Sequence, residues 1–146
     1  MKLSTKGRYA TRAILELALN YGKGVMTLQD IAKRQEISVR YLERLMSTLV
    51  SAGIVSSIRG QHGGFFLSKP PKEIKLSQVI QVVEGSLSPV PCLDNPKLCK
   101  RVGICSTKDI WTKIKKAILD VLDSITLEDM IKMQKKKYED TFVYNI

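Results

Sequence analysis

The chain has 146 residues, of which 44% are hydrophobic, and its formal net charge is +10 at pH 7. This composition is typical of a globular protein and argues against a disordered chain. The charge is uneven: residues 1–69 carry 11 lysines and arginines against 4 acidic residues, whereas residues 70–146 carry 13 against 10. The basic excess of the first half predicts a polyanionic partner. No apolar run approaches the roughly 20 residues of a membrane span, and the N-terminus has no hydrophobic signal core, so we expect a cytoplasmic protein.

The first predicted helix begins at Ser4 and Thr5 and ends in the segment Tyr21–Gly24. Its apolar residues recur at three- and four-residue spacings and form one stripe. Four basic side chains crowd its start, namely Lys2, Lys6, Arg8 and Arg12. We expect this end, with Lys6 and Arg8 foremost, to contact a nucleic-acid backbone; the alternative is a solvated basic face. Phosphate contacts of this kind supply affinity but do not read sequence.

The segment from about residue 28 to residue 51 predicts two short helices joined by a tight turn. Thr27 and Asp30 suit the start of the first helix, and Ser38 suits the start of the second. After Ser38, apolar residues at helical spacing are expected to face a core: Tyr41, Leu42, Leu45, Met46 and Leu49. This order of elements is typical of a helix-turn-helix.

The polar face of the second helix carries the candidates for contact with base edges. They are Ser38, Arg40, Tyr41, Glu43 and Arg44. Arginine can form paired hydrogen bonds with guanine, and glutamate can accept one from the cytosine amino group. Two alternatives stay open here, because Glu43 could instead form salt bridges with its neighbours and Tyr41 could belong to the core.

Two short β-like runs follow, from about residue 54 to residue 68, around the glycine-rich sequence Gly60–Gly64. Together they predict a hairpin, and helix, turn, helix and hairpin in this order indicate a winged helix-turn-helix that binds DNA. We call residues 54–68 the wing. Arg59 and His62 lie at its expected tip, where a guanidinium can enter a narrow minor groove. No cysteine is near His62 in sequence, so an exposed wing residue is favoured over a metal ligand.

A further short helix is expected before Gly85, and residues 85–105, which we call the cysteine loop, are rich in proline and lack periodicity. A helix should then begin at a Ser106 cap. In it, an apolar seam with heptad-like spacing is formed by Trp111, Ile114, Ile118, Val121 and Ile125. The seam could pack on its own domain, but we favour pairing with the same helix of a second subunit. A dimer also suits DNA, because two recognition helices about 34 Å apart match successive turns of the major groove.

The predicted fold is therefore mainly α with a small β-hairpin wing. We expect a DNA-binding domain over residues 1–84, the cysteine loop over 85–105, and a dimerisation helix with a final helix over 106–137. The last helix opens at Thr126–Asp129, and residues 138–146 are expected to form an apolar, aromatic C-terminal tail.

The cysteine loop contains all three cysteines, Cys92, Cys99 and Cys105, with the spacing C-x6-C-x5-C. Structural zinc takes four ligands, commonly in C-x2–4-C pairs, and this spacing matches neither condition. The thiols could be incidental, redox-sensing or ligands of an iron–sulfur cluster. Cys105 lies next to a helix start, which favours its thiolate form.

Four segments together resemble the IscR-type regulators of the Rrf-two winged-helix family. They are MKLSTKGRYA, ISVRYLERLMSTLVSAGIVSSIRGQHGGFFL, the three-cysteine loop followed by Trp111, and SITLEDM, so the resemblance spans residues 1 to about 133. It implies a dimer joined by the long helix and a 2Fe–2S cluster on Cys92, Cys99 and Cys105, in a regulator of iron–sulfur cluster assembly genes. It also implies DNA contact by residues 28–51, with Glu43 linked to promoter choice, and by the Arg59–Gly60 wing.

The sequence departs from this family pattern at two positions. Lys108 stands where a fourth, histidine ligand is expected, and Arg8 stands where some relatives have an acidic ligand. The fourth ligand is therefore open among Asp94, Asp109 and an exogenous thiol.

Two other functions remain open at this point. The ending Tyr144-Asn145-Ile146 resembles that of CymR-like relatives, which carry no cluster and act with cysteine synthase. It predicts, as the alternative, a cluster-free repressor of cysteine and sulfur genes. An iron–sulfur carrier without a DNA function is the alternative from another class. An enzyme is not expected, because the sequence has no His/Asp pair, nucleophile elbow or phosphate-binding loop.

Overall fold

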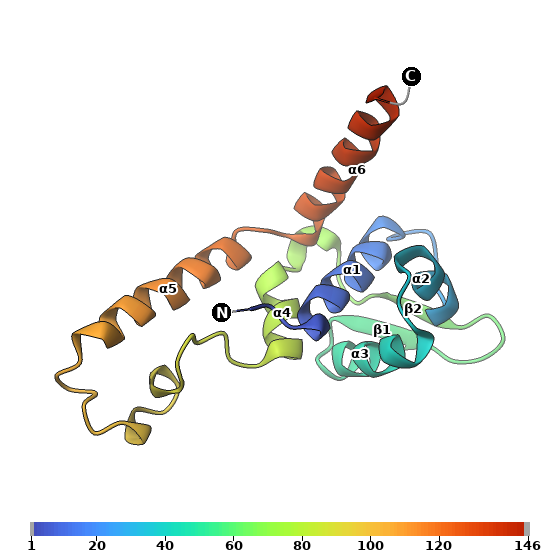
Figure 1. Cartoon of the computed structure of the whole chain (residues 1–146). Helices are drawn as coiled ribbons and strands as arrows, with labels where there is room; N and C mark the ends of the chain where they lie inside the picture. Colours follow the sequence, from blue (N-terminus) through green and yellow to red (C-terminus); the bar gives the residue numbers. More distant parts are fainter. Residues whose placement is uncertain (1, 145–146) are drawn as a thin grey trace.

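The computed structural model describes residues 2–144 and is mostly helical, with a single two-stranded hairpin in that range (Figure 1). The fold class predicted from the sequence is confirmed. In chain order the elements are α1 (Thr5–Leu19), α2 (Leu28–Gln35), α3 (Val39–Ser51), β1 (Val55–Ile58), β2 (Gly64–Leu67), η1 (Pro71–Glu73), α4 (Leu76–Glu84), η2 (Pro91–Leu93), η3 (Pro96–Leu98), α5 (Ser106–Asp123) and α6 (Leu127–Tyr144).

The first three helices begin where the sequence predicted, because polar side chains cap their free backbone N–H groups. The Ser4 hydroxyl accepts from the backbone N–H of Gly7 at 3.3 Å, and the Ser38 hydroxyl accepts from that of Tyr41 at 3.2 Å. Thr27 and Asp30 form a reciprocal capping box at the start of α2. These caps fix the two helices and the intervening turn that the helix-turn-helix pattern requires.

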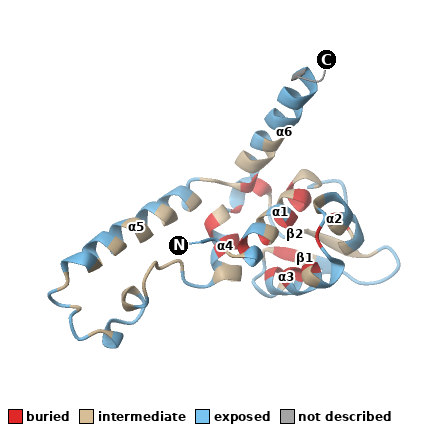
Figure 2. Cartoon of the chain, in the orientation of Figure 1, coloured by how far each residue is buried: buried red, intermediate tan, exposed pale blue. Residues whose placement is uncertain are grey.

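A single apolar core lies between α1, α3, α4 and the hairpin, as Figure 2 shows. It contains the buried residues predicted on α3, namely Leu42, Leu45, Met46 and Leu49. Leu127, at the start of α6, is fully buried in the same core. The backbone N–H of Leu127 also donates to the Ile74 carbonyl at 2.9 Å. The chain therefore returns after α5 to the body formed by α1–α4 and the hairpin, before α6 begins.

The wing is an antiparallel hairpin in which Val55 pairs with Leu67 and Ile58 pairs with Gly64. Its loop is tight at Gly63, where an added Cβ atom would lie 2.1 Å from the Ile58 carbonyl oxygen. Only glycine fits there, because the obstacle is backbone. The loop residue Gly60 has φ of 111°, a conformation that glycine adopts at little cost.

The second half of the chain extends away from this body as two arms, α5 and α6 (Figure 1). Three expectations need correction here. Ser106 is the first residue of α5 rather than its cap, and Ile125 lies beyond the end of that helix at Asp123, so it is not part of the helical seam. The segment predicted as a tail is helical as far as Tyr144, since no glycine or proline interrupts α6. Asn145, Ile146 and the side chain of Tyr144 lie outside the description. No helix within residues 2–144 is long and apolar enough to cross a membrane.

Candidate nucleic-acid interface and cysteine loop

The exposed face of α3 and the wing border a common groove of about 620 Å³. Glu43 and Ser47 line it from α3, and Arg59 and Gly60 line it from the wing. Arg40, Arg44 and the wing residue His62 are also exposed, as is the cap Ser38. The structure thus places the predicted α3 and wing residues on neighbouring exposed surfaces, although it contains no DNA.

The structure bears on the two alternatives left open above, a salt bridge for Glu43 and a place in the core for Tyr41. No lysine or arginine of the described chain lies within 4.0 Å of the Glu43 carboxylate, so the salt-bridge alternative has no support in this structure. Tyr41 is half-buried and packs edge-on against Tyr9 of α1, with ring centroids 5.5 Å apart. Its ring is therefore a link between α1 and α3, and only part of it is free to meet DNA.

The basic side chains at the start of α1 differ in how much they contact the rest of the chain. Lys6 and Arg8 are exposed, and the Arg8 guanidinium donates to the Thr5 hydroxyl at 3.4 Å and lies 5.9 Å from the centre of the Tyr9 ring. Arg12 instead donates from Nε to the side-chain oxygen of Gln35 at 2.9 Å, and a second guanidinium nitrogen donates to the Gln35 backbone carbonyl. Arg12 is also exposed, but these hydrogen bonds engage its guanidinium with the last residue of α2.

A carboxylate that the sequence did not reveal joins the start of α1 to the end of α4. The Glu84 carboxylate accepts from the backbone N–H groups of Ser4 and Gly7, each at 3.1 Å, and from the Ser4 hydroxyl. An anion at a helix N-terminus is stabilised by the free N–H groups and the helix dipole. Glu84 is also the last residue before the cysteine loop, so this contact ties the base of the loop to the basic end of α1.

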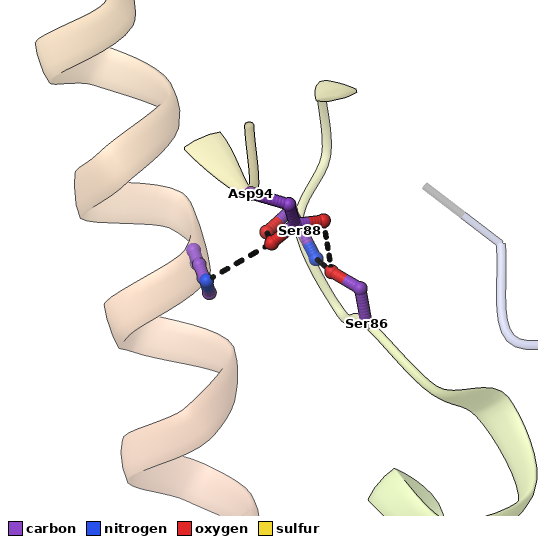
Figure 3. Close-up of polar contacts among 4 residues, drawn as sticks. Ser86, Ser88 and Asp94 are labelled. Atoms are coloured by element: carbon purple, nitrogen blue, oxygen red, sulfur yellow. Dashed lines mark hydrogen bonds and ion pairs between the residues drawn. The ribbon is translucent and has the colours of Figure 1, made fainter. Parts of the chain in front are cut away.

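Asp94 fastens the cysteine loop to α5 (Figure 3). Its carboxylate accepts hydrogen bonds from the hydroxyls of Ser86 and Ser88 and lies 3.5 Å from the Lys115 ammonium. These contacts, the Ser86 hydroxyl first, hold the pKa of Asp94 below its usual range. Asp94, one of the candidate fourth ligands, is thus already engaged, whereas Asp109 is exposed on the first turn of α5.

The three cysteines are free thiols, each partly exposed. Cys105 occupies the N-cap position of α5, where the hydroxyl of Thr107 and then the backbone N–H of Lys108 lower the pKa of its thiol. This agrees with the prediction that the helix start favours its thiolate. Among the described residues, however, no three cysteine, histidine or acidic side chains are grouped closely enough to hold a metal ion. The donor chemistry fits an iron–sulfur cluster, but this structure does not bring the three thiols together.

The apolar residues of α5 have little cover from their own chain. None of its residues is buried, and Ile110 and Val121 are 51% and 58% exposed. The contacts of α5 are mainly with α4 and with η2 of the cysteine loop. An apolar helix face of this length that is left in water is a marker of an interaction surface.

Comparison of the sequence with known protein families identifies the family of this chain. Residues 3–133 match the family model Rrf2, described as an iron-dependent transcriptional regulator. The chain belongs to the Rrf2 family of transcription regulators.

Relatives named for two different kinds of regulation are similar to this Rrf2 chain. The HTH-type transcriptional regulator CymR of Bacillus subtilis is 43% identical over 130 residues, which is 89% of each chain. A solved structure of that CymR, called the global cysteine regulator of B. subtilis, matches with a TM-score of 0.77 and 40% identity, covering 91% of this chain and 98% of CymR. The T. potens IscR structure matches with a TM-score of 0.78 and 42% identity, covering 94% of this chain and 90% of IscR. The chain is thus a DNA-binding transcription regulator rather than an enzyme, and an iron–sulfur carrier without a DNA function is not supported.

Proposed function

We propose that this Rrf2 protein is a homodimeric regulator in which α3 reads base edges in the major groove while the wing and the start of α1 hold the DNA backbone. The exposed polar face of α3, beside the groove that it shares with Arg59 and Gly60, supports this assignment. On α3, Arg40 and Arg44 are free to bind guanine, and the unpaired Glu43 is free to accept from cytosine. Lys6, Arg8 and His62 would add backbone or minor-groove contacts.

The exposed apolar face of α5 supports dimerisation through this helix. Of the predicted seam, Val121 is exposed, whereas Trp111, Ile114 and Ile118 are half-buried. The outward apolar residues of α5 are Ile110, Ala117 and Val121, whose spacing of seven and four places them in one stripe beside that seam. Pairing two copies of the stripe would remove it from water and would present two α3 helices to one duplex. A protein that acts on DNA in this way belongs in the cytoplasm.

We assign the cysteine loop to sensing, with Cys92, Cys99 and Cys105 as ligands of a 2Fe–2S cluster that reports cluster supply to iron–sulfur assembly genes. The observation that carries this assignment is the set of three free, partly exposed thiols on one short loop, one of them with a lowered pKa. Such a cluster, when bound, supplies a redox-active and oxidant-sensitive centre. The fourth position would fall to Asp109 or an exogenous thiol, since Asp94 is held by two serines and a lysine.

The chain's own residues provide a route from this loop to the DNA-binding surface. Asp94 ties the loop to α5, and Glu84 ties the residue before the loop to the first turn of α1. Between the two ties, Gly85 has φ of 75° and ψ of −127°, a conformation that suits glycine. A conformational change in the cysteine loop would therefore shift both α5, the proposed dimer helix, and the basic start of α1.

A second candidate function rests on the likeness to CymR. In it, the chain would be a cluster-free repressor of cysteine and sulfur genes, gated by cysteine synthase bound at Tyr144, Asn145 and Ile146. The 43% identity to CymR of B. subtilis supports this alternative, whereas the three-cysteine loop supports the cluster sensor.

The two candidates are separated by the iron and sulfide content of the protein purified without oxygen. The cluster sensor predicts about two irons and two sulfides per subunit, with loss of both in Cys92→Ala, Cys99→Ala and Cys105→Ala. A colourless protein that takes up no iron on reconstitution would favour the partner-gated repressor. Asp94→Asn provides a control. Because the Asp94 carboxylate is already held by Ser86, Ser88 and Lys115, we do not assign it as an iron ligand, and this variant should keep the cluster.

A further inference from the structure

Glu16, on the inner side of α1, is a carboxylate that is only 4% exposed. A buried charge is costly unless hydrogen bonds and opposite charges compensate it. Here the Gln35 side-chain amide donates to Glu16 Oε1 at 2.6 Å, and the Arg34 guanidinium lies 3.6 Å from Oε2. Both partners come from the last turn of α2, so the carboxylate joins α1 to the end of that helix.

Arg12, one turn earlier on α1, grips the same glutamine from the other side. Its guanidinium donates both to the Gln35 side-chain oxygen and to the Gln35 backbone carbonyl. The planar, forked guanidinium suits two simultaneous hydrogen bonds, whereas a lysine ammonium does not reproduce this geometry. Arg12 and Glu16 thus satisfy both ends of the Gln35 side chain. We call these three residues the clamp.

The clamp lies at the turn that sets the direction of α3. Gln35 is the last residue of α2, and Glu36 after it has φ of 55°, a left-handed conformation that is uncommon for a residue with a side chain. Ser38 then caps α3. Holding Gln35 therefore fixes the backbone just before the two-residue step into the recognition helix.

A second contact path runs from the clamp to the first turn of α3. The Arg12 guanidinium lies 5.4 Å from the centre of the Tyr9 ring, within cation–π range. The Tyr9 ring in turn packs edge-on against Tyr41 of α3 at 5.5 Å. Arg12 is thus connected to α3 both through the turn and through the two aromatic rings.

We propose that Arg12, Glu16 and Gln35 are positioning residues that set the angle at which α3 meets the DNA, and that Arg12 does not act as a phosphate contact. The proposal rests on the assignment of α3 as the base-reading helix. A positioning residue and a phosphate contact differ in a measurable way. Loss of a phosphate contact lowers affinity for all sequences and reduces the salt slope by about 0.9. Loss of a positioning residue lowers the preference for the correct sequence and leaves the salt slope unchanged.

The test compares Arg12→Lys, which keeps the charge, with Lys6→Gln, which removes an exposed charge from the same helix. The probes are a duplex selected by the wild-type protein from a random 30-base-pair library and a scrambled duplex, each titrated at several salt concentrations. We expect Arg12→Lys to lower affinity for the selected duplex about tenfold, with little change for the scrambled duplex and no change in slope. Lys6→Gln should weaken both duplexes alike and reduce the slope.

Exchanging the amide and the carboxylate within the clamp distinguishes a positioning role from a simple folding defect. Gln35→Glu alone brings two carboxylates together and should reduce the preference for the selected duplex. Adding Glu16→Gln restores one amide and one carboxylate at the same pair of positions, so the double variant should regain most of the lost preference.

The proposal would be overturned if Arg12→Lys bound the selected duplex with wild-type affinity while Arg12→Gln reduced the salt slope. It would also be overturned if the double variant preferred the selected duplex no more strongly than Gln35→Glu does. Failure of the underlying α3 assignment gives a different result. In that case Arg40→Ala and Glu43→Ala would also leave the preference for the selected duplex unchanged.

Discussion

Gly7→Ala is expected to destabilise the protein, although the same change in a helix ordinarily stabilises it. Alanine is favoured over glycine within a helix by about 1 kcal/mol. At Gly7, however, the new Cβ atom would lie 2.4 Å from Oε1 of Glu84 and 2.9 Å from Cδ1 of Leu3, so the Leu3 side chain must shift and the Glu84 carboxylate must leave its place at the start of α1. That carboxylate accepts two backbone hydrogen bonds and one hydroxyl hydrogen bond there.

The size of the effect follows from these two opposing contributions. Losing charged hydrogen bonds at a helix N-terminus costs about 2 kcal/mol. Against the gain of about 1 kcal/mol in helix propensity, this leaves a net loss of about 1 kcal/mol in the free energy of unfolding. Urea-induced unfolding followed by circular dichroism, at one fixed protein concentration, measures the difference.

The control for this prediction is the same substitution in a Glu84→Ala background. With the carboxylate removed, Gly7→Ala should become stabilising by about 0.5–1 kcal/mol, because helix propensity then outweighs the remaining close contact with the exposed Leu3 side chain, which can shift. A stabilising Gly7→Ala in the wild-type background would show that Glu84 does not hold the start of α1 in solution.

Three further predictions concern the wing, α3 and the cysteine loop. Arg59→Ala should weaken binding to the selected duplex and reduce the salt slope by about 0.9, measured by fluorescence anisotropy; an unchanged slope would exclude a backbone contact by this side chain. Glu43→Ala should relax base preference at one position, worth about 1–3 kcal/mol in a binding-site selection, and an equal loss on every sequence would refute a reading role. The carboxyl carbon of Asp94, followed by NMR, should titrate below the usual aspartate range, so that its tie to α5 persists at mildly acidic pH and is lost only as the pH falls through this lowered pKa. The variant Ser86→Ala should raise that pKa, since the Ser86 hydroxyl is its largest cause, and no rise would contradict the assignment.

The DNA-binding half could be predicted closely because its signals are local. Capping by Thr27 and Ser38 depends on residues only three positions away, and the buried face of α3 follows from helical spacing. The hairpin likewise follows from a glycine-rich turn between two β-like runs, and the strands lie within a residue or so of the predicted ends.

The contacts that tie this half together could not be predicted from local pattern. Glu84 meets Ser4 across 80 positions, and Arg12 meets Gln35 across 23. Such pairs depend on tertiary packing. The spacing of apolar residues predicts which face of a helix is buried, but it does not predict which polar side chains will meet. One signal was present at Glu16, a charged residue on the apolar side of α1, and it could have suggested a buried polar contact.

The second half was harder to predict because α5 has no buried residue and contacts mainly α4 and η2. The seam predicted on α5 shares only Val121 with the exposed apolar stripe of that helix. Ile125 belongs to the return segment, where its carbonyl accepts from the backbone N–H of Leu76 at 2.8 Å. Helix ends are also uncertain by a residue or two where no side-chain cap fixes them, as at Cys105 and Ser106. The final helix ran further than expected because nothing in residues 138–144 stops it.

The most direct test of the whole account compares DNA affinity with and without an intact cysteine-loop centre. Protein purified without oxygen and shown to contain iron and sulfide is titrated with the duplex that it selects, before and after the iron is removed with a chelator. A coupling of about 1–3 kcal/mol predicts that the dissociation constant changes by about 5- to 150-fold. The same change should be absent in Cys92→Ala, which starts without the centre. Equal affinities for the loaded and iron-free wild-type protein would contradict the claim that the cysteine loop controls DNA binding.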